Sequence, residues 1–204
     1  MHSLASSFVL GYHGCDRAVA EKLLAGVPFN ASTNDWDWLG HGIYFWEANP
    51  ARGLEFAKQI KLWRNDQNLT PINEPYVVGA VIELGYCLDL LTSAHIDFVA
   101  YCREANAQAP LNSGGQDSLF RRLDCAVINH LHSIRDNFRR RPFDSVRGVF
   151  IEGDPLYPSS GFYHKTHIQI CIRNTSMIKG VFRVPDDQLS GNMQAFLSGT
   201  RHSI

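Results

Sequence analysis

Two segments of the chain combine histidine, glycine and aromatic residues in an order that suits a flat ligand carrying hydroxyl groups. In the first, Tyr12-His13-Gly14 follows an apolar run and precedes an expected helix. A histidine ring can hydrogen-bond a hydroxyl such as that of a ribose, and a glycine lets a ligand approach the backbone closely. The segment therefore predicts a ligand contact at the end of a strand, with a purely structural histidine as the alternative.

The second segment, residues 39–45, is built around a tight turn. Gly40 and Gly42 permit the turn, which delivers Tyr44 from a short strand. An aromatic ring in this position can stack on a heterocycle, which is worth about 1 kcal/mol beyond the area it buries. Phe56 follows twelve residues later, so we expect the rings of Tyr44 and Phe56 to enclose a planar group. The alternative for Tyr44 is a core tyrosine whose hydroxyl is already hydrogen-bonded.

Hydrophobic periodicity and turn residues place these segments in an α+β fold. Asp16 can cap a first helix that Gly26 ends, and Pro50 suits the first turn of a second. We expect strands at residues 8–12, 42–46, 76–84, 146–151, 166–172 and 177–184, and helices at 17–25, 50 to about 64, 93–105 and from Asp117 onward. This order predicts a mostly antiparallel or mixed sheet in a single domain over residues 1–204.

Taken in order, these pieces resemble the catalytic domain of the poly(ADP-ribose) polymerase and diphtheria-toxin class of ADP-ribosyltransferases. The matching residues are Tyr12-His13-Gly14, then Gly40-His41-Gly42-Ile43-Tyr44-Phe45, then Gly53-Leu54-Glu55-Phe56-Ala57. The close match covers about a quarter of the chain. The resemblance implies a split, mostly antiparallel sheet with flanking helices, NAD as co-substrate, and no metal.

The resemblance also implies a role for each residue of the expected NAD site. His13 would bind the 2′-hydroxyl of the nicotinamide ribose, and Gly14 would hold the carboxamide through its backbone. Tyr44 and Phe56 would sandwich the nicotinamide ring, with Phe56 standing where the family usually has tyrosine. Gly42 in the turn and Gly53, near the carboxamide, complete the expected cofactor-binding set: His13, Gly14, Gly42, Tyr44, Gly53 and Phe56.

The sequence departs from the family at a third element, where the family has a glutamate early in a late strand. Residues 165–172 contain no glutamate, and the spacing places His167 or Thr166 at that position, with Gln169 close behind. Alternation along a strand puts His167 and Gln169 on one face, as expected if that face lines a cleft. Glu152, at the end of the preceding strand, is a further candidate. The expected catalytic set is therefore His13, Tyr44, His167, Gln169 and Glu152.

Because family members without this glutamate are often mono-transferases, we expect a single transfer of ADP-ribose from NAD to a macromolecular acceptor, with release of nicotinamide. Two alternatives keep the pocket: an NAD glycohydrolase, and a binding module for NAD or ADP-ribose without turnover. A more distant alternative is an RNA 2′-phosphotransferase. That enzyme needs several basic residues near the site, and only His41 and Arg52 are close in sequence.

Residues 88 to about 143 form an expected helical insertion into this core. It carries Phe120-Arg121-Arg122 and an arginine-rich run at residues 135–141. Arginines interleaved with aromatic residues can bind phosphates and stack on bases, which would make the acceptor a nucleic acid or an acidic protein surface. The alternative is a helix pair that packs on the sheet with its charges in water.

Composition limits the other classes of function. The 204 residues carry a net charge of -1, so the molecule as a whole has no field that would gather nucleic acid or an anionic membrane. The five cysteines form no CxxC pair or metal-type spacing, and no apolar run approaches the roughly 18 residues of a membrane span. We expect a reduced, cytoplasmic protein without a membrane partner, or an effector delivered without an N-terminal signal. A toxin of this family would have an antitoxin or inhibitor protein as a further partner.

Overall fold

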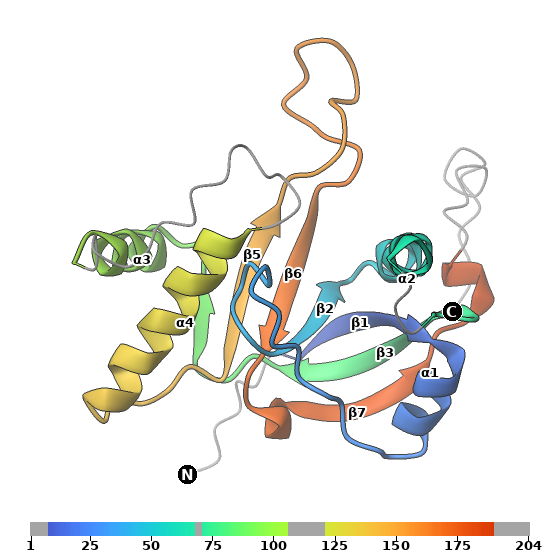
Figure 1. Ribbon diagram of the computed structural model, residues 1–204, viewed down its shortest axis with the longest axis horizontal. Helices are drawn as coiled ribbons and strands as arrows, with labels where there is room; N and C mark the ends of the chain where they lie inside the picture. The colour runs from blue at the N-terminus through green and yellow to red at the C-terminus, as the bar shows by residue number, and fades with distance from the viewer. Residues whose placement is uncertain (1–7, 68–70, 106–120, 190–204) are drawn as a thin grey trace.

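Seven strands form one sheet in the order β4-β5-β6-β2-β1-β3-β7, in a computed structural model that describes residues 8–67, 71–105 and 121–189 (Figure 1). All neighbouring strands are antiparallel except β4 and β5, which are parallel. The strands are β1 (Phe8–Asp16), β2 (Ile43–Glu47), β3 (Pro75–Glu83), β4 (Cys87–Asp89), β5 (Ser145–Phe150), β6 (His167–Ile172) and β7 (Ile178–Arg183). The α+β class and the mostly antiparallel sheet predicted from the sequence are confirmed.

Within the described ranges, four α-helices and two 3-10 turns accompany the sheet: α1 (Arg17–Leu24), α2 (Pro50–Asp66), α3 (Ser93–Ala105), α4 (Arg122–Asn137), η1 (Thr175–Met177) and η2 (Asp186–Gln188). Local sequence explains the first two helices. The Asp16 carboxylate accepts a hydrogen bond from the Ala18 amide at 2.8 Å, and α1 ends before Gly26, whose φ is +90°. Pro50 opens α2, and the Asn49 side chain accepts from the Arg52 amide at 3.0 Å.

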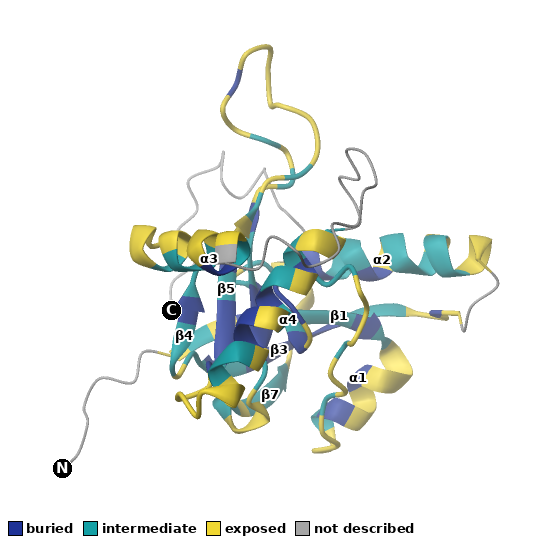
Figure 2. Cartoon of the chain, turned by 60° about the vertical axis from the view of Figure 1, so that its left-hand side comes forward, coloured by how far each residue is buried: buried dark blue, intermediate teal, exposed yellow. Residues whose placement is uncertain are grey.

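The helices divide between the two faces of the sheet. Helix α1 packs on one face, where Ala20 and Leu23 meet Cys15 and Val78. Helix α2 covers the other face of β1, and a Cβ atom added at Gly14 would overlap the Gly53 carbonyl oxygen. That close approach explains a glycine at position 14 by packing alone. Figure 2 shows that the buried residues concentrate on the strands and on the sides of the helices that face them.

The expected insertion is part of the core rather than an appendage. Its first residues form β4, a strand that the sequence did not predict, which extends the sheet beside β5. Helices α3 and α4 pack on the same face as α2, where Ile128 and Leu131 join Val146 and Cys171 in one buried cluster. Helix α4 begins at Arg122, and the expected start of a helix at Asp117 lies outside the described residues.

The sheet separates where β1 meets β2. Strand β1 pairs with β3 along nine positions but with β2 at only two, Gly11 with Glu47 and Tyr12 with Trp46. In Figure 1, β2 and β6 rise away from β1, β3 and β7 at this point. Since β1 extends to Asp16, four residues beyond the predicted end at residue 12, His13 and Gly14 lie on the strand beside the opening.

Candidate functional site

His13 spans the opening between β1 and β2. Its Nδ1 atom lies 2.9 Å from the Tyr44 carbonyl oxygen. Because a carbonyl oxygen only accepts, Nδ1 carries the ring hydrogen, and Nε2 is left as an acceptor. The ring packs against Phe29 and Phe45, with centroids 5.3 and 5.7 Å away, and burial lowers the pKa of His13. A neutral imidazole with a free acceptor nitrogen can accept a hydrogen bond from a ligand hydroxyl.

Gly14 presents its backbone to the same opening. The Leu10 carbonyl accepts from the Ala48 amide at 2.9 Å, so the even-numbered residues of β1 direct their backbone groups toward β2. The paired positions of β1 and β2 end at Tyr12, two residues before Gly14. The amide and carbonyl of Gly14 therefore point into the separation between β1 and β2.

Tyr44 has its hydroxyl hydrogen-bonded within its own turn. The hydroxyl donates to the Gly40 carbonyl at 2.8 Å and accepts from the Leu39 amide at 2.9 Å, and burial raises its pKa. Gly40 has a φ of +80°, which favours glycine, and Gly42 packs directly against Cys171 on β6. The turn thus fixes the hydroxyl of Tyr44, and its half-buried ring packs against the core cluster that contains Ile128 and Cys171, as expected for the alternative of a core tyrosine.

Phe56 lies on α2 against Trp46, a residue that the sequence analysis did not select. The two ring centroids are 4.7 Å apart, and Trp46 is 2% exposed. Gly53, in the same helix, lies over Trp46 and Val77. The ring of Phe56 thus packs on the protein's own Trp46, and the enclosure of a planar group by Tyr44 and Phe56 stays a prediction. Alternation along β2 could have identified Trp46, because it follows Tyr44 by two residues on the same face.

His167, at the position of the missing glutamate, begins β6 and is 5% exposed. Its Nδ1 atom lies 2.6 Å from the Lys165 carbonyl oxygen, so Nδ1 donates and Nε2 is an acceptor. The ring lies beside Phe150 and Trp46, with centroids 5.4 and 6.3 Å away. Burial is the main cause that lowers the pKa of His167, and the ring is therefore neutral at neutral pH.

Gln169 shares this face of the sheet with His167, as strand alternation predicted, and pairs across the sheet with Trp46. Its Oε1 atom accepts a hydrogen bond from Trp38 Nε1 at 2.6 Å. The Trp38 ring in turn packs against Phe150 at 5.1 Å. The amide NH2 of Gln169 can still donate and Oε1 keeps a second lone pair, so the side chain can orient a ligand by hydrogen bonds but supplies no base.

Glu152 reaches the site from the end of β5 and is paired with a buried arginine. The Glu152 Oε2 atom lies 2.5 Å from Arg52 Nη2, with the two side chains 24% and 6% exposed. Arg52 also lies 3.4 Å from Glu55 and from Gln59. The charge of Glu152 is therefore balanced by Arg52.

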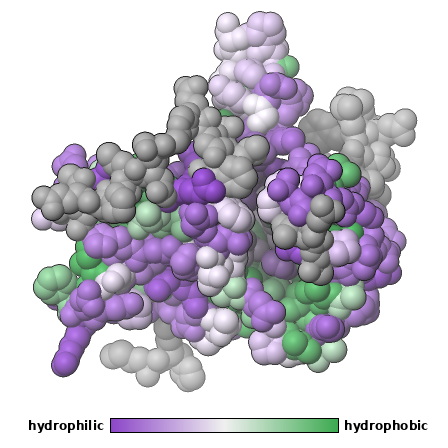
Figure 3. All heavy atoms as spheres, in the orientation of Figure 1, coloured by the Kyte–Doolittle hydropathy of each residue, from purple (hydrophilic) through white to green (hydrophobic). Residues whose placement is uncertain are grey.

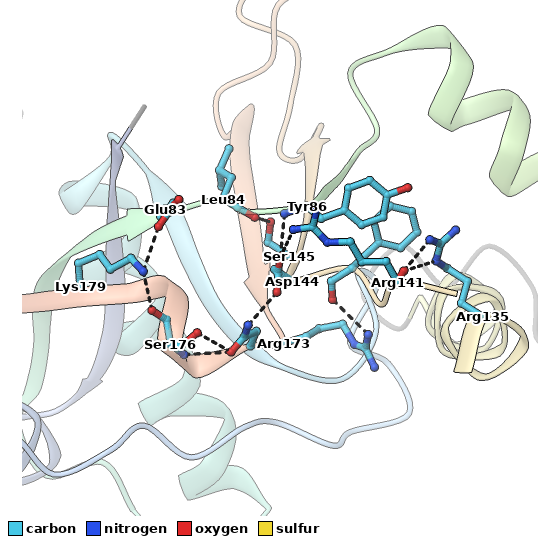
Figure 4. Close-up of polar contacts among 12 residues, drawn as sticks. Glu83, Leu84, Tyr86, Arg135, Arg141, Asp144, Ser145, Arg173, Ser176 and Lys179 are labelled. Atoms are coloured by element: carbon cyan, nitrogen blue, oxygen red, sulfur yellow. Dashed lines mark hydrogen bonds and ion pairs between the residues drawn. The ribbon is translucent and has the colours of Figure 1, made fainter. Parts of the chain in front are cut away.

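Arg121, Arg135 and Arg141 of the insertion pack on aromatic rings of the protein itself. Arg135 and Arg141 lie over the stacked rings of Tyr86 and Phe143, and Arg135 donates to the Arg141 carbonyl (Figure 4). Arg121 lies nearest the site, with its guanidinium 5.2 Å over the ring of Phe150, which itself neighbours the His167 ring. Figure 3 shows that the α4 side of the molecule is largely hydrophilic, whereas hydrophobic residues gather at lower right, near α1.

Comparison with known proteins identifies one similar chain. No protein-family model and no solved structure matches this sequence. The sequence is similar to an uncharacterized protein of Methanocaldococcus jannaschii, with 25% identity over 187 residues that cover 82% of this chain and 83% of that protein. The similarity thus extends over most of both chains. No helix within the described residues is long and apolar enough to cross a membrane.

Proposed function

We propose that this protein binds NAD where β1 and β2 separate and transfers its ADP-ribose once to a macromolecular acceptor, releasing nicotinamide. One observation carries the proposal: His13, Gly14 and Tyr44 meet at the end of the β1–β2 pairing, where His13 Nδ1 lies 2.9 Å from the Tyr44 carbonyl. Tyr44 lies 31 positions after His13, and the two belong to separate segments of the motif that resembles ADP-ribosyltransferases.

Each group has a chemical task in this proposal. His13 Nε2 accepts a hydrogen bond from the hydroxyl of the nicotinamide ribose, since Nδ1 is occupied. The backbone of Gly14 binds the carboxamide, while the rings of Tyr44 and Phe56 bind the flat nicotinamide. Holding the dinucleotide in a fixed geometry lowers the barrier to breaking its glycosidic bond. The acceptor then attacks C1′ of the ribose.

The charge of the site supports a single transfer rather than chain growth. The family's strand glutamate is replaced by neutral His167 and Gln169, and the nearby Glu152 is paired with Arg52 at 2.5 Å. An unpaired carboxylate that would stabilise an oxocarbenium-like transition state is thus missing from these positions. The same feature favours a second candidate, a module that binds NAD or ADP-ribose without turnover.

Labelled NAD tests the proposal and separates these candidates. The purified protein is incubated with NAD labelled in the ADP-ribose and with a cell lysate, and label is measured in protein, RNA and DNA alongside free nicotinamide. His13→Ala should reduce labelling and nicotinamide release at least tenfold, whereas His130→Ala, an exposed position on α4, serves as the matched control. Equal labelling by His13→Ala would overturn the site. NAD binding by calorimetry without nicotinamide release would favour the binding module.

A further inference from the structure

Three side chains beside the proposed NAD site have buried polar atoms that lack hydrogen-bond partners among the described residues. The atoms are Trp46 Nε1, Arg52 Nε and His167 Nε2, and the three residues are 2%, 6% and 5% exposed. Buried polar groups in folded proteins are nearly always hydrogen-bonded, to protein or to ordered water. Three such atoms in neighbouring residues therefore indicate that an additional polar group binds at this place.

The three residues come from three elements that meet at one place. Trp46 on β2 and His167 on β6 lie on the same sheet face, with ring centroids 6.3 Å apart. The first turn of α2 covers Trp46, because a Cβ atom on Gly53 would lie 3.6 Å from the Trp46 ring. Arg52 directly precedes Gly53, and its charge is among the causes that lower the pKa of His167.

The chemistry of the three atoms defines what they can hold. Trp46 Nε1 and Arg52 Nε can only donate, whereas His167 Nε2 accepts, because Nδ1 donates to the Lys165 carbonyl. Two donors and one acceptor complement an oxygen that carries a hydrogen. The surroundings have little net charge, since Arg52 and Lys165 balance Glu152 and Glu55 and the imidazole is neutral. An unprotonated phosphate oxygen would place its lone pairs against the lone pair of His167 Nε2, which is repulsive. A cation would meet the two N–H donors, which is repulsive as well.

We propose that Trp46, Arg52 and His167 together bind one hydroxyl group, from water or from an alcohol of the acceptor, and that His167 Nε2 takes its proton. This step rests on the proposed function. The hydroxyl oxygen forms a bond to C1′ of the nicotinamide ribose as the bond from C1′ to nicotinamide breaks. The electron pair of that bond returns to the nicotinamide ring, which leaves neutral. The proton passes to His167 Nε2 and then to solvent.

The structure also explains why His167 is the base among the three sequence candidates. Gln169 carries an amide, which does not take up a proton near neutral pH, and its Oε1 already accepts a hydrogen bond from Trp38 at 2.6 Å. Glu152 is engaged by Arg52 at 2.5 Å. His167 Nε2 has no described partner. It is the acceptor of the three that stays free for the nucleophile.

A crystal structure of the free protein tests the hydroxyl site without reference to activity. We expect an ordered oxygen within about 3.2 Å of all three atoms. A cluster without such an oxygen would overturn the inference. If the oxygen is present but the wild-type protein neither binds nor cleaves NAD, the proposed function fails while the hydroxyl site stands.

Substitution of His167 tests its role as base. His167→Asn keeps an NH donor near Nδ1 but removes the Nε2 acceptor, so NAD binding by calorimetry should stay within about threefold while nicotinamide release falls at least about 100-fold. His130→Asn is the matched control. Unchanged release by His167→Asn would contradict the assignment. Adding methanol to the wild-type reaction separates the two sources: methyl ADP-riboside indicates an alcohol in the site, and ADP-ribose alone indicates water.

Discussion

The ion pair between Arg52 and Glu152 holds the first turn of α2 against the end of β5, and its removal should be costly. Arg52→Met retains most of the apolar stem of the side chain but leaves the Glu152 carboxylate, 24% exposed, without its partner. Removing one member of a buried pair typically costs 3–5 kcal/mol. Because Glu152 keeps some contact with water, we expect a loss of about 3 kcal/mol in the free energy of unfolding.

A double-mutant cycle with Glu152→Gln isolates the pair from other effects of each substitution. The two changes together should cost less than their sum, with a coupling energy of about 2 kcal/mol. Urea unfolding followed by the fluorescence of the four tryptophans measures all variants. Arg183→Met is the control, because Arg183 and Glu21 form a pair of similar length, 2.6 Å, with both side chains exposed. A loss below about 1 kcal/mol for Arg52→Met would refute the reasoning.

Three further predictions concern burial, packing and the aromatic turn. Burial lowers the pKa of His132 to about 3. As the pH is lowered from 6.5 to 3, the unfolded protein takes up this proton before the folded protein does, so the free energy of unfolding should fall by up to about 1.4 kcal/mol per pH unit. His132→Leu should flatten this dependence in urea unfolding at successive pH values. Gly14→Ala would force its methyl group against the Gly53 carbonyl and should lower the free energy of unfolding by about 1–3 kcal/mol, measured by urea unfolding. An unchanged urea midpoint would show that α2 moves away at no cost. Tyr44→Phe should cost about 1–3 kcal/mol of stability, because the Leu39 amide loses its acceptor and the Gly40 carbonyl loses its hydroxyl donor, yet calorimetric NAD affinity should stay within about threefold. A much larger loss of affinity would mean that the hydroxyl binds the ligand.

The sequence predicted the features that depend on neighbouring residues. Asp16 and Asn49 cap their helices, Pro50 opens α2, and alternation places His167 and Gln169 on one face. These outcomes follow from backbone preferences and local hydrogen bonds, which act within a few residues. The class of the fold follows in turn from the order of strands and helices.

Local signals failed where an element gains its stability from distant partners. Strand β4 has three residues and exists because it pairs with β5, about sixty positions later. The end of β1 was placed too early, because pairing with β3 carries the strand through His13 and Gly14 to Asp16. In both cases a hydrogen-bonded neighbour, rather than the propensity of the segment, decides the conformation.

The sequence by itself determined the residue types of the candidate site: a histidine and glycine at a strand end, an aromatic turn, and a late strand without a glutamate. Only the tertiary structure decided how those residues are used. It pairs Glu152 with Arg52, one hundred positions away, occupies Gln169 with Trp38, and leaves His167 Nε2 unpartnered among the described residues beside Trp46. The physical reason is that hydrogen bonding and burial of a side chain depend on which elements approach it, and that approach is set by the pairing and packing of the whole sheet.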